Sequence, residues 1–344
     1  MGFRRLRLSD LGFGAPLQRE SFSAPQPDLQ RPAAAAPSSV LHSLNQINRR
    51  LERILMDLRD VSSADTDLRA IARELIDAVN RDTDIALASI FLNQIGGAYA
   101  IRHCTEAAII AGLVAQAMGR NAPEVLIVTA AALTMNVGMV RQSELFQSRD
   151  SALTGEERAI IRRHPSDSVD MLRYAGINDE QWLDLVLLHH ENDDGSGYPQ
   201  GRLGDEISQN ARLISLADRY CAFVSARNYR RSLLPPVALE RLHGEQEIPF
   251  DQELTAHFTR VIGAYPPGTL VRLHNGASGV VSGRMDGQGA FCVHLLRAPD
   301  GGALPLPEKR STADAGYGIE SALEEDAAKL RFTMQQIWGE LASL

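Results

Sequence analysis

Apolar residues recur at helical spacing through most of the chain. In the first clear stripe they alternate steps of three and four residues, with Arg and Glu between them: Leu44, Ile47, Leu51, Ile54 and Leu58. The stripe predicts an amphipathic helix and a linker over residues 41–64. Such a helix packs on its own domain or pairs with a second chain as a coiled coil. Because the stripe covers few heptads, we expect packing within the domain and keep a homodimer as the alternative.

The helical pattern continues from residue 65 to residue 262. Its next stripe follows Ser63 and Asp65, either of which is a suitable N-cap. Further apolar helical stretches then alternate with short polar breaks, and no alternating strand pattern interrupts them. We therefore predict a single all-α domain over residues 65–262.

The pattern changes after the Pro266-Pro267 pair. Residues 269–273 read as a strand, Asn275-Gly276 is a hairpin signal, and residues 291–296 supply a further strand. These features predict a small β segment of three or four strands over residues 263–310. We expect a linker and a last amphipathic helix, from Ser321 to Leu341, within residues 311–344. The predicted fold class is mainly α, with a small C-terminal β appendage and a terminal helix.

The remaining N-terminal segment and the composition indicate where the protein works. Residues 1–40 are rich in Pro, Ser, Ala and Gln without a sustained apolar period, which predicts a disordered arm. No apolar run reaches the roughly 20 residues of a membrane span, and no apolar segment of a signal peptide follows the N-terminal arginines. The three cysteines form no CxxC pair, as in proteins of a reducing compartment. We expect a cytoplasmic protein without membrane insertion.

Charge excludes one class of partner. The formal net charge of the 344 residues is −8. Proteins that bind nucleic-acid polymers without sequence preference need a basic surface to neutralise phosphates. We therefore expect no nucleic-acid polymer as a partner.

One stretch, from His189 to Pro199, carries most of the chemistry. Two adjacent histidines close an apolar helix, and an acidic, Gly-rich loop that ends in proline follows them. Imidazole and carboxylate ligands hold Fe, Mn or Zn and leave positions open for water, as hydrolysis of phosphate esters requires. A single histidine is more often structural than a ligand, but an adjacent buried pair needs a reason. The candidate ligands are His103, His164, His189, His190 and Asp218.

The same stretch resembles the signature of the HD-GYP family. The matching residues run His189-His190-Glu-x-x-Asp194-Gly-x-Gly197-Tyr198-Pro199 and continue with Gly201, Leu203, Gly204 and Ile207. Residues 154–157, 163–165 and 211–220 resemble further segments of the family in the same order. The likeness therefore extends over residues 65–260, and the signature half is highly specific.

The resemblance implies a helical HD-superfamily domain in bacterial signal transduction, a hydrolase of the second messenger cyclic di-GMP with a two- or three-metal site. By this resemblance the metal ligands are His103, His164, His189, His190 and Asp218. The implied substrate-binding residues are Gly195, Gly197, Tyr198, Pro199, Arg227 and Arg230. It further implies that the loop offers a surface to GGDEF-type cyclase domains.

The chain departs from the family pattern where the name-giving His-Asp pair belongs, at residues 133–139. There Met135 stands in place of the histidine, Asn136 in place of a bridging aspartate and Met139 in place of a phosphate-contacting lysine. Upstream, Tyr99 occupies a position where some members have an extra glutamate ligand. A neutral amide cannot bridge two cations as a carboxylate does, and a thioether prefers soft ions. With the dyad replaced by Met135 and Asn136, we assign no catalytic residue.

We interpret the chain as a degenerate HD-GYP protein of cyclic di-GMP signalling, a pseudoenzyme that senses the nucleotide or contacts other signalling proteins. The alternative is an active metal-dependent cyclic di-GMP phosphodiesterase that uses the three histidines His164, His189 and His190. A third interpretation is a scaffold that binds no nucleotide. The expected cofactor is a single divalent Fe, Mn or Zn ion, or none.

Overall fold

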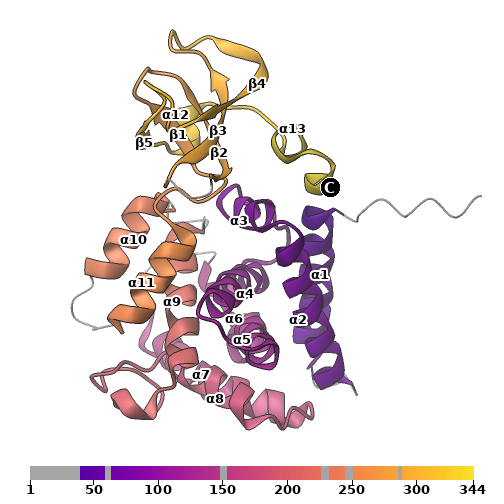
Figure 1. Cartoon of the computed structure of the whole chain (residues 1–344). Coiled ribbons are helices and arrows are strands. Elements are labelled where there is room, and N and C mark those ends of the chain that lie inside the picture. The colour runs from indigo at the N-terminus through magenta and orange to yellow at the C-terminus, as the bar shows by residue number, and fades with distance from the viewer. Residues whose placement is uncertain (1–38, 59–62, 148–152, 226–231, 245–250, 286–288) are drawn as a thin grey trace, which may run out of the picture. The chain divides into compact units, whose positions relative to one another are not determined.

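The structure is a computed structural model of the chain (Figure 1). It describes residues 39–58, 63–147, 153–225, 232–244, 251–285 and 289–344. The disordered arm predicted for residues 1–40 lies outside these ranges, apart from Ser39 and Val40, where the first helix begins.

Helices make up the described chain as far as Ile262. In order they are α1 Val40–Met56, α2 Ala64–Arg81, α3 Thr83–Phe91, α4 Tyr99–Ala117, α5 Ala122–Thr134, η3 Val137–Met139, α6 Val140–Gln147, α7 Gly155–Tyr174, α8 Glu180–Leu188, η4 Gly204–Glu206, α9 Gln209–Val224, α10 Pro235–Gly244 and α11 Gln252–Ile262. Helix α4 is central, because it contacts helices on several sides, including α1, α2, α5, α9 and α11. It is apolar nearly all round, as a helix enclosed by others must be.

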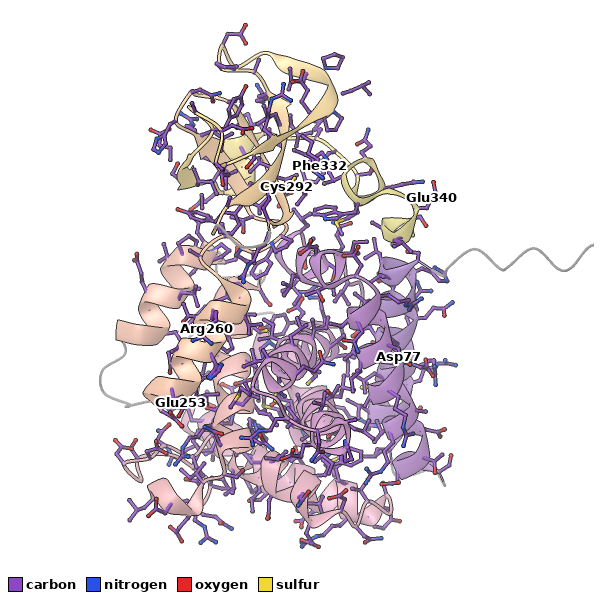
Figure 2. All side chains as sticks on the ribbon, in the orientation of Figure 1. Asp77, Glu253, Arg260, Cys292, Phe332 and Glu340 are labelled. Atoms are coloured by element: carbon purple, nitrogen blue, oxygen red, sulfur yellow. The ribbon has the colours of Figure 1, made fainter. Side chains whose placement is uncertain are left out.

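The apolar stripe of α1 is buried within its own chain. Leu44 and Leu51 are fully buried, and α1 packs along α2, with further contacts to α3 and α4. The opposite faces of these helices are polar, as Asp77 on α2 illustrates (Figure 2). The stripe therefore serves packing within the domain, as expected, and the coiled coil that would have carried a homodimer is not available from this face.

One helical stretch, Ala122–Ser143, is long and apolar enough to cross a bilayer, although no apolar run of that length was expected from the sequence. Most of it is buried inside the protein, as in core helices of comparable length and composition.

The C-terminal part is an antiparallel sheet. Its strands are β1 Leu270–Leu273, β2 Ser278–Arg284, β3 Phe291–Arg297, β4 Ala303–Ser311 and β5 Ile319–Ala322. They lie in the order β4-β3-β2-β1-β5, so that every pairing is antiparallel. The fold class, mainly α with a C-terminal β part, is thereby confirmed, although five strands form where we expected three or four.

The predicted terminal helix from Ser321 to Leu341 is wrong. Strand β5 extends the β part beyond residue 310, and two short helices follow, α12 Glu325–Ala328 and α13 Met334–Trp338, with the 3-10 turn η5 Gly339–Ala342. Lys329 adopts a left-handed conformation, φ 47°, and ends α12.

The apolar spacing in this region has another cause. Some of the side chains cover one face of the sheet, where Phe332 lies against it, while Met334 and Leu341 pack against the helical core (Figure 2). The layer on the sheet consists of Leu92, Leu270, Val280, Leu296, Leu323, Ala328, Leu330, Phe332, Ile337 and Trp338. An irregular segment that crosses a sheet face can reproduce steps of three and four residues without being one helix.

Candidate metal site

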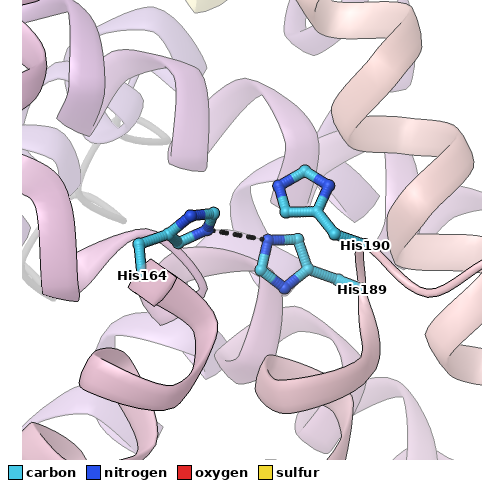
Figure 3. A group of neighbouring side chains, drawn as sticks. All are labelled: His164, His189 and His190. Carbon is cyan, nitrogen blue, oxygen red and sulfur yellow. Dashed lines mark hydrogen bonds between the residues drawn. The ribbon is translucent and has the colours of Figure 1, made fainter. Parts of the chain in front are cut away.

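Three histidines from two helices form the core of the candidate site. His164 lies in the middle of α7, His189 caps the C-terminus of α8 and His190 follows it. A capping box at Thr154 and Glu157 sets the start of α7. The ligand nitrogens of the three histidines all lie within 4.8 Å of one another (Figure 3).

The ring of His164 is oriented by a carbonyl that a proline leaves available. Pro165 has no N–H, so the carbonyl of Ile161, four residues earlier, loses its usual helical donor. The Nδ1–H of His164 donates to that oxygen at 2.6 Å. The helix thus gives up one backbone hydrogen bond and uses the acceptor to hold an imidazole.

His189 is oriented in the same way by a helix end. The last four carbonyls of a helix have no intrahelical donor, and His189 Nδ1–H donates to one of them, Val186 O, at 2.7 Å. In both histidines Nδ1 therefore carries the hydrogen and Nε2 carries a lone pair. Backbone acceptors of this kind are the usual outer partners of metal-binding imidazoles.

The two Nε2 atoms face each other at 3.3 Å (Figure 3). Since each is an acceptor, they cannot form a hydrogen bond with one another, and their lone pairs repel unless a cation lies between them. Two nitrogens bound at about 2.0–2.1 Å to one tetrahedral ion are roughly 3.3 Å apart. The pair therefore fits a divalent transition metal.

Burial keeps the imidazoles neutral, which metal binding requires. Burial, reinforced by His189, lowers the pKa of His164 to about 3. Burial also lowers the pKa of His189, and it lowers that of His190 well below the usual range, with His189 adding to the effect. Neutral rings in this arrangement are available to bind a metal ion.

The other two predicted ligands form a separate pair beside the three histidines. His103 Nε2 lies 2.8 Å from Asp218 Oδ1, and both side chains are buried. Burial raises the pKa of Asp218, but the hydrogen bond with His103 outweighs that effect and holds the pKa well below its usual range. Among the described residues, the close group of potential ligands contains three imidazoles and no carboxylate.

The predicted substrate loop folds back over the histidines. The ring of Tyr198 lies 4.7 Å from that of His190, and the peptide bond from Tyr198 to Pro199 is cis. At Gly197 a Cβ atom would come within 2.4–2.6 Å of the backbone of residues 190–192, so only glycine fits. Gly195 adopts φ 77°, which also favours glycine.

Glu191 holds the far side of this loop. Its buried carboxylate accepts hydrogen bonds from the amides of Gln200, Gly201 and Arg202, at 2.6, 3.1 and 2.9 Å. Glu191 belongs to the signature from His189 to Pro199. Its role in holding the loop depends on amides that only the folded loop brings to it.

Met135 and Asn136, where the family resemblance expects the His-Asp pair, lie against the helix that supplies His164. Met135 and Asn136 are both buried, and Ser168 of α7 donates to the carbonyl of Met135 at 2.9 Å. At Gly138 a Cβ atom would come within 2.7 Å of the His164 carbonyl oxygen, so the two segments touch. The side-chain oxygen of Asn136 has no hydrogen-bond partner in the described part of the chain.

Two predicted phosphate contacts, Arg227 and Arg230, lie outside the described residues. Two other arginines that the sequence analysis did not single out lie near the histidines. Arg162 places its guanidinium 5.2 Å from the centre of the Tyr198 ring. Arg219 donates to Asn192 Oδ1 at 2.7 Å and lowers the pKa of His189 and His190 through its charge, after the larger effect of burial. The available signal was their position in the sequence, since Arg162 lies two residues before His164 and Arg219 directly follows Asp218.

Comparison with known proteins identifies the family of the chain. Residues 68–254 match the HD domain family, and the chain belongs to that family.

The chain is similar to two proteins in sequence and to a third in structure. The chain is 29% identical over 261 residues to the cyclic di-GMP phosphodiesterase PA4108 of Pseudomonas aeruginosa, covering 73% of this chain and 62% of that protein. It is 34% identical over 143 residues to the cyclic di-GMP phosphodiesterase response regulator RpfG of Xanthomonas campestris pv. campestris, covering 41% and 38%. The chain thus spans less than two thirds of these relatives. Bd1817, an HDG"Y"P protein from Bdellovibrio bacteriovorus, shares the fold, with a TM-score of 0.52, 14% identity and coverage of 67% of this chain and 74% of that one.

Proposed function

We propose that this HD domain protein binds cyclic di-GMP at a single-metal site without hydrolysing it, and so acts as a sensor or as a contact module for other signalling proteins of the cytoplasm. The observation that carries the proposal is the composition of the site. His164, His189 and His190 form a group of neutral imidazoles that lacks a carboxylate among the described residues. The ligand class comes from the relatives, whose names identify cyclic di-GMP phosphodiesterases.

The donor set supports one ion rather than two. In a two-metal site a carboxylate or hydroxide bridges ions about 3.5–4 Å apart. Asp218 is engaged with His103, and the buried amide of Asn136 is neutral. The resemblance places the bridging aspartate of the family at Asn136, so its replacement removes the group that would hold a second ion.

A bound ion would supply a Lewis acid for a phosphate oxygen. The chain's own residues have other tasks. The carbonyls of Ile161 and Val186 orient two of the rings, and Tyr198 covers His190. With one ion and no bridging carboxylate, the site would still bind an anion but would activate an attacking water less.

The second candidate function is a slow phosphodiesterase that uses this three-histidine site. It is favoured by one observation, because catalytic zinc sites commonly have three protein ligands and an open position for water. The three histidines meet that description without a further ligand.

One preparation distinguishes the two functions. Metal content, calorimetric titration with cyclic di-GMP and chromatography of the nucleotide after long incubation should be measured on the same metal-loaded protein, with His189→Ala as the control. We expect one metal per chain, saturable binding and intact nucleotide. Formation of pGpG or GMP in proportion to protein, and its loss in His189→Ala, would establish the phosphodiesterase instead. If metal-loaded protein binds no cyclic di-GMP, both functions are contradicted. The remaining interpretation is then a scaffold that binds no nucleotide.

A further inference from the structure

Arg162 is an exposed cation at the edge of the metal site. It precedes His164 by two residues on α7, and its guanidinium lies 5.2 Å from the ring centre of Tyr198. That ring is in turn 4.7 Å from the ring of His190 and 6.4 Å from that of His164. One aromatic layer therefore separates the guanidinium from the nitrogens that face the metal position.

The neighbouring arginines of α7 are engaged elsewhere. Arg163 donates to both carboxylate oxygens of Asp167, at 3.1 and 2.9 Å, and Arg158 donates to the carbonyl of Leu153. Within the described ranges, no carboxylate lies within ion-pair distance of Arg162. Its contact is the face of Tyr198, which attracts a cation through the ring quadrupole.

A guanidinium that stacks on a ring keeps its hydrogen-bonding edge available. The group is planar and donates within that plane, so it can lie on an aromatic face and still bind an anion through two N–H groups. Lysine cannot do both, because its ammonium is a compact point charge. The Tyr198 ring thus holds the guanidinium beside the site and leaves its donors available.

We propose that Arg162, seated on Tyr198, is a phosphate-binding residue of this site and donates hydrogen bonds to a phosphodiester held at His164, His189 and His190. The identity of the ligand as cyclic di-GMP rests on the proposed function. At Met139, where the family resemblance predicts a phosphate-contacting lysine, the side chain is uncharged. Arg162 supplies a cation to the same ligand from a different helix.

The test compares Arg162→Gln and Arg162→Lys with wild type, and uses Arg163→Gln as the matched control on the adjacent exposed residue. All four proteins are loaded with Mn²⁺, and equal metal content shows that the site is intact. Calorimetry measures the affinity for cyclic di-GMP at two salt concentrations. Separately, ³¹P relaxation of inorganic phosphate measures anion binding next to the bound Mn²⁺.

We expect Arg162→Gln to weaken cyclic di-GMP binding by about 10-fold or more and to reduce the relaxation of phosphate. Its affinity should depend less on salt than that of wild type, a change that a purely structural role would not produce. Arg162→Lys should lie between the two, and Arg163→Gln should stay within about two-fold of wild type.

The outcomes separate this inference from the proposed function. If wild type binds cyclic di-GMP and Arg162→Gln binds both ligands equally well, the inference is overturned and the function stands. If wild type binds phosphate but no cyclic di-GMP, the proposed function fails. The ³¹P relaxation of phosphate then decides the role of Arg162, because an equal effect in Arg162→Gln overturns the inference and a reduced effect supports it. If wild type binds neither ligand, the inference is overturned as well.

Discussion

Single atoms determine what the histidines can do. The carbonyl of Ile161 accepts from His164 only because Pro165 cannot donate to it, and that donation turns Nε2 toward His189. His164 and Pro165 are adjacent in the sequence, which predicts both histidines to be metal ligands. The sequence could not show which ring nitrogen of His164 faces His189. That orientation depends on the Ile161 carbonyl, which has no backbone donor because Pro165 lacks an N–H.

Pro165→Ala tests this orientation. Alanine restores an N–H that competes with His164 for the Ile161 carbonyl, so metal affinity should fall by about 10–100-fold. The melting temperature of metal-free protein should not fall, because a proline has been removed from a helix interior. Metal titration and thermal unfolding measure the two effects.

The matched control is Pro123→Ala, in the first turn of α5, where proline interrupts no helical hydrogen bond. It should leave metal affinity unchanged. Unchanged metal affinity in Pro165→Ala would mean that the proline does not govern the ring of His164.

Helix ends and one loop assemble the site. Helix α8 ends at His189, and the loop that follows returns so that Tyr198 covers His190. Long, strongly periodic helices such as α1 and α2 were predictable because burial imposes a period of 3.6 residues. The C-terminal segment was not, because its apolar residues are divided between a sheet face and the helical core, an arrangement that imposes no such period.

Gly197→Ala tests the loop as an element. The added Cβ meets backbone atoms within 2.4–2.6 Å, so the loop must shift and Tyr198 should leave His190. We expect the free energy of unfolding to fall by about 1–3 kcal/mol, together with weaker cyclic di-GMP binding. Denaturant unfolding and calorimetry measure these effects.

Gly155→Ala is the control for this substitution, since a Cβ there has no neighbour within 4 Å. Its stability should equal or slightly exceed that of wild type, because alanine is the better helix former. Equal behaviour of the two glycine variants would show that the close approach at Gly197 is not required.

At the scale of the whole molecule, the sheet and the segment that follows it are attached to the helices at several points. Arg284 of β2 donates to the carbonyl of Arg260 at the end of α11, and Ser39 before α1 donates to the carbonyl of Leu341 near the C-terminus. Asp84 of α3 faces β2 at Gly283. None of these contacts was predictable from the sequence, since each joins segments that only the folded chain brings together.

Asp84 makes this attachment sensitive to pH. Burial and the nearby Asp82 raise the pKa of its carboxyl to about 6, although Arg284 opposes the shift. An acid whose pKa is higher in the folded state stabilises the fold below its unfolded pKa, and that stabilisation is lost as pH rises through about 6. Asp84→Asn should therefore raise the free energy of unfolding by about 1 kcal/mol at pH 7.5 and change it little at pH 4.

Urea unfolding at the two pH values measures this difference, with Asp77→Asn on the exposed face of α2 as the control (Figure 2). The control should show no such pH dependence. If Asp84→Asn stabilises the protein equally at both pH values, the Asp84 carboxyl does not make the attachment of the sheet sensitive to pH.

The central claim is that the chain binds cyclic di-GMP at the three-histidine site and leaves it intact. The most direct measurement follows labelled cyclic di-GMP incubated with metal-loaded protein at concentrations that saturate binding. We expect the nucleotide to be bound and recovered unchanged, and His189→Ala no longer to bind it. Conversion to pGpG or GMP at a rate proportional to protein concentration, abolished in His189→Ala, would contradict it.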